Sequence, residues 1–365
     1  MSNKAKNPRL GKVGGQAVLE GVMMRSGDDI ALAVRQENGN IAVKRSQFTS
    51  VRKKNKILNI PIIRGFVNFI EMMKLSYSTL TDSAKLLGLD DLDEDTKLDR
   101  WLKEKFGEKT MGVIMGVASV LGVILALGLF TVLPMLITTW IKPLIGDEDR
   151  WINNFLLSLI SGVIRIILFI IYMFLVSLMK DIRRTFEYHG AEHKSIACYE
   201  SGDELTPANA KRHTRFHPRC GTSFIFVILL ISILIFSLVP WHTATVLDKV
   251  LMILFRLCLL PFVTGIGYEF LMLAGKHPNK CTLALALPGL LMQRITTKEP
   301  DESQLEVAIK ALKLAMPAEF PEEAAEADEE EKAEQETEEK NEEAGTEENE
   351  IKPDAEGPAA PDTEE

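Results

Sequence analysis

Cysteine is scarce in this sequence. Its 365 residues contain four cysteines, too few for the disulfide framework of a small secreted domain. Residues 1–29 are polar and glycine-rich, and they lack the apolar core of about 7–15 residues that marks a secretory signal peptide. We therefore expect the N-terminus to stay in the cytosol and the thiols to stay reduced.

Several functional motifs are absent as well. The sequence has no phosphate-binding glycine loop, no nucleophile elbow and no base-reading module. We expect no nucleic-acid partner. No motif specifies the oligomeric state.

Acidic charge is concentrated at one end of the chain. The formal net charge is −9, but residues 317–365 hold 22 acidic and 3 basic residues, and the rest holds 29 acidic and 39 basic ones. A basic, apolar body is therefore joined to an acidic tail. Since large apolar residues are almost missing from 317–365, we predict a disordered tail there, open to solvent or to a protein partner.

Long apolar runs dominate the middle of the chain. A helix that crosses a bilayer needs about 20 apolar residues, and the runs at 111–141, 152–179, 222–241 and 250–274 meet this requirement. We therefore predict a mainly α-helical, polytopic membrane protein with about four transmembrane helices in the lipid bilayer. An even number of spans places both termini on one side.

Basic residues indicate the orientation of these spans. The loop at 142–150 has two of them and the loop at 242–247 has none. The loop over 180–221 has eight: Lys180, Arg183, Arg184, Lys194, Lys211, Arg212, Arg215 and Arg219. Because positive charge resists translocation, we expect this loop and both termini to be cytoplasmic.

Residues 1–110 are expected to form a cytosolic N-terminal region. Alternating apolar residues over 30–47 flank Asn38-Gly39, which predicts a β-hairpin and hence a small β element. The stretch 57–80 is apolar but carries three charges, which favours an amphipathic helix at the membrane surface.

The spans occupy 111–275, and a cytosolic segment follows over 276–316. Within it, the apolar run 281–292 is too short to cross a bilayer, so we predict a re-entrant or buried piece. Apolar residues at helical spacing predict a helix over 301–316, capped by Asp301 or Ser303.

The cytosolic loop contains an H-x-x-E-H pattern at His189, Glu192 and His193. On a helix, the two histidines lie one turn apart, about 6 Å along the axis, and Glu192 shares their face. Two neutral imidazoles can hold Zn²⁺ while the carboxylate acts as general base, as in H-E-x-x-H proteases with the inner residues reversed. Gly190 disfavours the helix by about 1 kcal/mol, and the alternative is a pair of interfacial histidines without a metal.

A second cluster, His217-Pro218-Arg219-Cys220, precedes the third predicted span. Because the neighbouring spans return to the same face of the membrane, His217 or Cys220 can complete a site with His189 and His193. Three protein ligands would leave room for a catalytic water, and four would make a closed structural site. The sequence allows both, and it also allows a plain turn beside a buried thiol.

Three nearby polar residues have a weaker case as ligands. Glu200 lies on the helical face of His189 but too far along an unbroken helix to share an ion. Cys198 faces the opposite side, and His213 is expected in a solvated basic loop.

Three ionisable residues, Arg165, Arg256 and Glu269, fall within predicted spans. Charges at that depth are costly and usually face a partner or a cavity. One interpretation is an ion pair between Glu269 and either arginine. The other is a route for protons or ions.

These motifs resemble those of the DUF1385 family of bacterial membrane proteins. The matching segments are 14–25 (GGQAVLEGVMMR), 188–194 (YHGAEHK), 217–224 (HPRCGTSF) and 288–297. The resemblance covers roughly residues 10–315 and leaves out the acidic tail. It implies a location in the bacterial inner (plasma) membrane. The family is described as predicted metal-dependent enzymes, with no established substrate to carry over.

Three functions remain open at this point. The first is a membrane-embedded zinc-dependent hydrolase, for instance a protease, with Glu192 as its base. The second is a transporter or channel whose metal site is regulatory. The third is a non-catalytic assembly factor in which the metal only holds the loop together.

Overall fold

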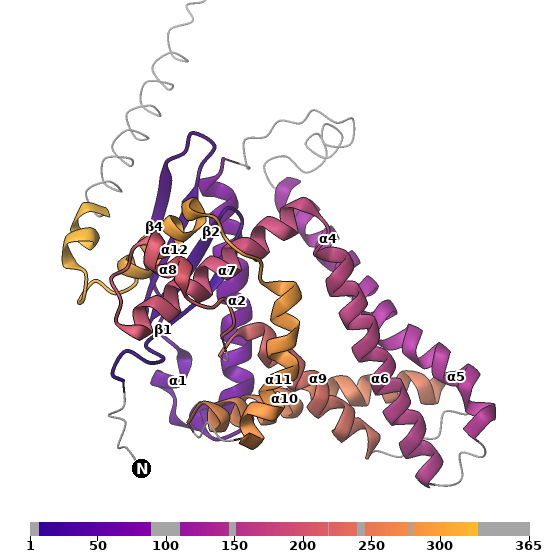
Figure 1. Cartoon of the computed structure of the whole chain (residues 1–365). Coiled ribbons are helices and arrows are strands. Elements are labelled where there is room, and N and C mark those ends of the chain that lie inside the picture. The colour runs from indigo at the N-terminus through magenta and orange to yellow at the C-terminus, as the bar shows by residue number, and fades with distance from the viewer. Residues whose placement is uncertain are drawn as a thin grey trace, which may run out of the picture.

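The computed structural model describes residues 7–88, 110–145, 151–217, 219–238, 245–276 and 280–327. Figure 1 shows a small sheet covered by helices, from which long apolar helices extend. The elements are β1 (Val13–Val18), β2 (Gly21–Ser26), β3 (Asp29–Arg35), β4 (Ile41–Gln47), α1 (Val51–Lys54), the 3-10 helix η1 (Lys56–Asn59), α2 (Ile63–Leu86), α4 (Thr110–Leu127), the π-helical turn η4 (Gly128–Val132), α5 (Leu133–Ile145), α6 (Trp151–Val176), α7 (Lys180–Ser201), α8 (Pro207–Arg212), α9 (Gly221–Ser237), α10 (Val246–Lys276), α11 (Lys280–Thr296) and α12 (Glu302–Leu314).

The four strands form an antiparallel meander in the order β1–β2–β3–β4. β3 and β4 confirm the hairpin predicted over 30–47, and Gly39 takes a φ of +87° in the turn between them. β1 and β2 form a further hairpin from the glycine-rich N-terminal segment, which the sequence did not predict. Glu20 occupies its tight turn with a φ of +48°. The β element is therefore larger than expected.

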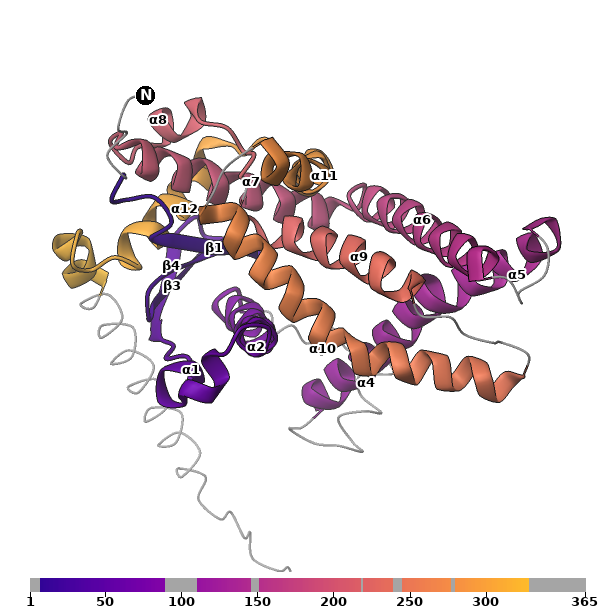
Figure 2. The same cartoon turned by 90° about the horizontal axis from the view of Figure 1, so that it is seen from below.

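Alternating side chains give the sheet two apolar faces. One face buries Val22 and Ala33 against α7 and α12. The opposite face buries Met23 and Leu32 against Leu75 of α2. Figure 2 shows the resulting layers, with the sheet between α2 and the pair α7 and α12. The sheet thus fixes α7, the helix that carries the H-x-x-E-H pattern.

Three helical segments in the described part of the chain are long and apolar enough to cross a membrane: Val120–Ile145, Phe155–Val176 and Val246–Phe270. They correspond to the first, second and fourth predicted spans. The third predicted span forms the 17-residue helix α9, of which only Phe224–Phe236 counts as an apolar helix. A helix of that length reaches about 25 Å, less than the hydrocarbon core of about 30 Å. The predicted total of four spans is therefore not confirmed.

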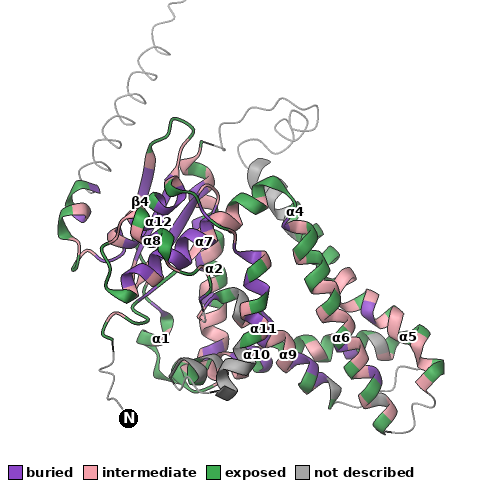
Figure 3. Cartoon of the chain, viewed as in Figure 1, coloured by how far each residue is buried: buried purple, intermediate pink, exposed green. Residues whose placement is uncertain are grey.

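Apolar side chains cover the outside of these helices. Figure 3 shows that α4, α5 and α6 are mostly exposed or half-exposed, while the central strands β2 and β3 and the second half of α7 are mostly buried. Leu125, Trp140 and Leu144 expose 69%, 84% and 85% of their surface. An apolar surface of this extent is compatible with lipid contact.

The stretch predicted as an interfacial helix forms η1 and most of α2. Arg64 of α2 forms an ion pair with Glu269 of α10. This differs from the predicted pairing of Glu269 with Arg165 or Arg256. Arg64 lies outside the predicted spans, and the prediction considered only charged residues within the spans as partners of Glu269.

The segment over 276–316 contains two helices, α11 and α12. The run predicted as re-entrant or buried lies within α11, which continues through Pro288. The predicted helix over 301–316 is α12, and Asp301 and Gln304 form a capping box at its start.

The acidic tail begins later than predicted. Residues 321–327 are helical, and Ala324 and Ala327 are buried. Phe320 packs on the cluster between the sheet and α12, and Glu319 accepts a hydrogen bond from the Tyr199 hydroxyl at 2.9 Å. The predicted boundary at residue 317 is thus wrong by about one short helix, because these few apolar residues suffice to fix it. Residues 328–365 lie outside the described part of the chain.

Candidate metal centre

Gly190 explains how α7 reaches its neighbour. The helix runs unbroken from Lys180 to Ser201, so the glycine does not interrupt it. A Cβ at Gly190 would overlap the carbonyl oxygen of Lys298, and the N–H of Lys298 donates to the carbonyl of Phe186 at 2.8 Å. A glycine is needed here because the backbone at Lys298 crosses the helix at close range.

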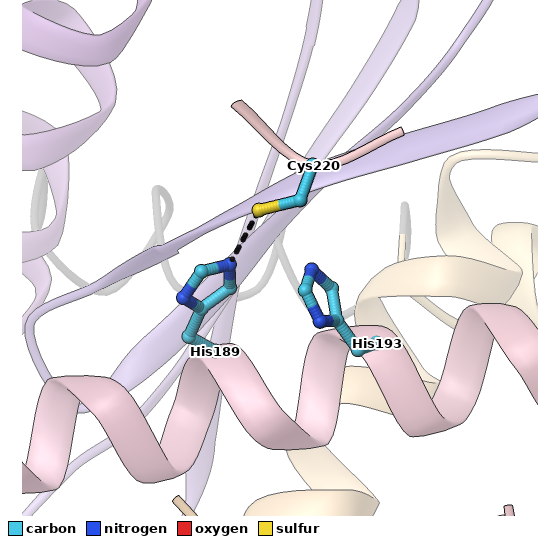
Figure 4. A group of neighbouring side chains, drawn as sticks. All are labelled: His189, His193 and Cys220. Atoms are coloured by element: carbon cyan, nitrogen blue, oxygen red, sulfur yellow. Dashed lines mark hydrogen bonds between the residues drawn. The ribbon is translucent and has the colours of Figure 1, made fainter. Parts of the chain in front are cut away.

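Three side chains converge on one face of α7. The ligand atoms of His189, His193 and Cys220 all lie within 4.8 Å of one another. Nε2 of His189 is 3.2 Å from Sγ of Cys220. Figure 4 marks this contact with a dashed line and shows the ring of His193 beside it. In a tetrahedral zinc site, donor atoms are separated by about 3.3–3.6 Å. Closing the group onto an ion therefore takes side-chain movements on the order of 1 Å.

Backbone carbonyls orient both imidazoles. Nδ1 of His189 lies 2.8 Å from the carbonyl oxygen of Thr296. Nδ1 of His193 lies 2.5 Å from that of Arg215. A ring that donates its Nδ1–H to a carbonyl presents the Nε2 lone pair on the other side, which is the tautomer that a metal needs. Burial also lowers the pKa of His193, which favours its neutral form.

Glu192 stands beside this group as a buried carboxylate. Its Oε2 lies 3.9 Å from Nε2 of His189. Burial raises the pKa of Glu192, and the nearby histidines and a hydrogen bond from the N–H of Gly15 oppose this shift. Gly15 packs closely against the side chain of Glu192, since a Cβ built at Gly15 would lie only 2.9 Å from Cγ of Glu192.

Gly15 contacts the site but was not among the predicted site residues. A glycine inside a strand often marks a close approach of two segments, but this signal depends on strand β1, which the sequence did not predict. The polar side chains of the same segment have partners elsewhere. Gln16 accepts a hydrogen bond from the Ser76 hydroxyl of α2 at 2.5 Å, and Arg25 donates a hydrogen bond to the carbonyl of Gly27. Glu20 pairs with Arg184 near the start of α7.

His217 lies next to the group of His189, His193 and Cys220 but is not part of it. Its ring centroid is 5.5 Å from that of His193. Gln293 holds its backbone through two hydrogen bonds of 2.7 and 2.8 Å. The ring faces Glu200, whose Oε2 is 3.8 Å from Nε2, and Glu200 also pairs with Arg219. Of the two predicted third ligands, Cys220 is the one that joins the group.

The remaining candidates lie away from the centre. Cys198 is buried in the core between α7 and the sheet, as its helical position predicted. His213 pairs with Asp203 at 2.8 Å instead of facing solvent alone. Glu200 lies near the end of the unbroken α7, which agrees with its predicted exclusion from the ion.

The fold and the site together define a class: a helical protein with membrane-compatible helices, a small antiparallel sheet and a His–His–Cys group that could hold a metal ion. The model of the family described as "Protein of unknown function (DUF1385)" matches residues 60–318, and the chain belongs to that family. It is 33% identical over 299 residues to the uncharacterized protein YqhQ of Bacillus subtilis (strain 168), a match that covers 82% of this chain and 90% of that protein. No solved structure matches the chain.

Proposed function

We propose that this protein is a multi-pass protein of the bacterial plasma (inner) membrane that hydrolyses its substrate at a zinc centre on the cytosolic side. One observation carries the metal assignment: two imidazoles, each held at Nδ1 by a backbone carbonyl, converge with the thiol of Cys220. The buried carboxylate of Glu192 beside them carries the hydrolase assignment.

The basic residues support the cytosolic orientation. α7 directly follows the candidate span that ends at Val176, and Cys220 directly precedes α9. The site therefore lies between two apolar helices, in the segment where the basic residues gather. Since positive charge is retained in the cytosol, this segment belongs on that side. Both terminal regions belong there too, because β1 and α12 pack on α7.

His189, His193 and Cys220 would hold the zinc ion, and the ion would supply a Lewis acid that makes a bound water more acidic. Glu192 is placed to accept the proton, because its carboxylate lies 3.9 Å from Nε2 of His189. The N–H of Gly15 orients that carboxylate. His193 and Glu192 are almost fully buried, whereas the His189 side chain is 12% exposed, so His189 marks the accessible side of the centre.

A structural metal site is the second candidate. It is favoured by the burial of His193 and Cys220, which expose 1% and 6% of their surface. In that case the ion would fix α7 to the start of α9, and the protein would serve as an assembly factor. Glu192 would then have no proton to accept.

Glu192→Gln separates the two functions. The variant keeps the side-chain shape, and Glu192 lies outside the ligand group, so the purified full chain should hold as much zinc as the wild type. For a protease, membranes that contain the wild type should show new peptide N-termini that are missing with Glu192→Gln. His213→Ala is the control and should keep both zinc and products. Equal zinc and identical termini in wild type and Glu192→Gln would favour the structural site.

A further inference from the structure

Two arginines lie near the middle of two candidate spans. Arg165 belongs to Phe155–Val176 and Arg256 to Val246–Phe270. A charge at that depth is costly unless a partner or a water-filled cavity compensates it. The metal centre does not use either residue.

Packing brings both arginines to α9. A Cβ at Gly162 of α6 would overlap the side chain of Ile233 of α9, so these two helices are in close contact. Arg165 lies three residues after Gly162 and therefore on the same face of α6. The guanidinium of Arg256 lies 5.5 Å from the ring centroid of Phe236, also on α9. Ile233 and Phe236 are three residues apart, so the two arginines approach the same stretch of α9.

No carboxylate in the described residues compensates these charges. Nε of Arg165 is buried and has no hydrogen-bond partner there. The acidic side chains of α10 are engaged elsewhere: Glu269 pairs with Arg64, and Asp248 accepts hydrogen bonds of 2.8 Å from Thr245 at the start of the helix. An anion from outside this set would stabilise such a pair of like charges in an apolar surrounding.

We propose that Arg165 and Arg256 bind the phosphate group of an anionic ligand within the membrane. Guanidinium groups match the oxygens of phosphate with two parallel N–H donors each. The cation–π contact of Arg256 with Phe236 uses the face of the ring and none of the N–H donors of the guanidinium. A phospholipid and inorganic phosphate share this chemistry. The site lies near the end of α9 opposite to Cys220, about 24 Å away along a helix of this length.

Lipid binding by the full chain in a neutral detergent tests the proposal. Native mass spectrometry would follow binding of phosphatidylglycerol, with phosphatidylcholine as the zwitterionic control, and a scintillation assay would follow labelled inorganic phosphate. We expect phosphatidylglycerol to bind in preference to phosphatidylcholine. Arg165→Gln and Arg256→Gln should each weaken it by about tenfold, the loss of one charge-assisted pair. Arg183→Gln removes an arginine whose side chain is 66% exposed, and binding should be unchanged.

The lysine variants protect the test against misfolding. Arg165→Lys and Arg256→Lys keep the charge but lose the planar fork, so they should fold and bind with intermediate affinity. Arginine-dependent binding of inorganic phosphate alone would support the site and assign it to a free anion. Equal binding of phosphatidylglycerol by the wild type and the double glutamine variant would overturn the proposal. So would a wild type that binds neither ligand, or one that binds both lipids alike.

Discussion

Gly190→Ala tests whether the close crossing at α7 holds the candidate centre together. In an open helix, alanine would stabilise the protein by about 1 kcal/mol relative to glycine. Here the new methyl would overlap the Lys298 carbonyl oxygen, with the carbonyl carbon 3.2 Å and Cδ of Pro300 3.3 Å away. Two backbone atoms and a proline ring cannot rotate aside as a flexible side chain would, so the segment from Lys298 to Pro300 must itself shift.

The expected net effect is a destabilisation of about 1–3 kcal/mol. Overpacking of this kind costs about 1–3 kcal/mol, and loss of the hydrogen bond from Lys298 to Phe186 adds about 1 kcal/mol, against the gain in helix propensity. The shifted segment directly follows Thr296, the last residue of α11, whose carbonyl holds His189. Loss of such an orienting partner typically weakens metal binding about 10–100-fold.

Thermal unfolding of the detergent-purified full chain and zinc retention against a chelator measure the two effects. Gly122→Ala is the matched control, because nothing lies within 4 Å of a Cβ at that helical glycine. It should leave both quantities unchanged or raise the melting temperature slightly. If Gly190→Ala were as stable and held zinc as tightly as the control, the crossing would not organise the site.

Three further predictions follow from the site and the core. Gly15→Ala should destabilise the protein by about 1–3 kcal/mol, because its Cβ would meet the Met23 carbonyl oxygen at 2.8 Å and Glu192 at 2.9 Å; unchanged thermal unfolding would refute this. In chelator-treated protein, stability should fall as the pH drops below the usual pKa of histidine, since burial lowers the pKa of His193 and the unfolded chain then binds the extra proton; His193→Gln should remove part of that slope. Truncation after residue 327 should leave thermal unfolding unchanged, whereas truncation after residue 316 should cost about 2 kcal/mol or more, because it removes Phe320 from the core.

The sequence predicted those elements whose signals are local. The Asn38-Gly39 turn and the period of two identified the β3–β4 hairpin, and the Asp301 cap identified α12. Apolar runs identified three of the long helices. Each of these signals lies within one continuous stretch of the sequence.

Long-range contacts explain what the sequence could not supply. No strand was predicted at Gly14-Gly15, because the pairing of Gly15 with Met24 and its contact with Glu192 join separate segments of the chain. The H-x-x-E-H pattern predicted the pair His189 and His193, but the choice of Cys220 over His217 depends on Gln293 of α11, which anchors the backbone of His217. Nothing in the spacing of the motifs contains that information.

X-ray absorption at the zinc edge of the purified, zinc-loaded full chain identifies the ligands of the bound ion. We expect two nitrogen ligands at about 2.0–2.1 Å and one sulfur ligand at about 2.3 Å. The sulfur contribution should vanish in Cys220→Ser and persist in Cys198→Ser, whose parent thiol lies in the core away from the group. A wild type that holds no stoichiometric zinc, or that binds zinc without a sulfur ligand, would show that His189, His193 and Cys220 do not form a zinc site.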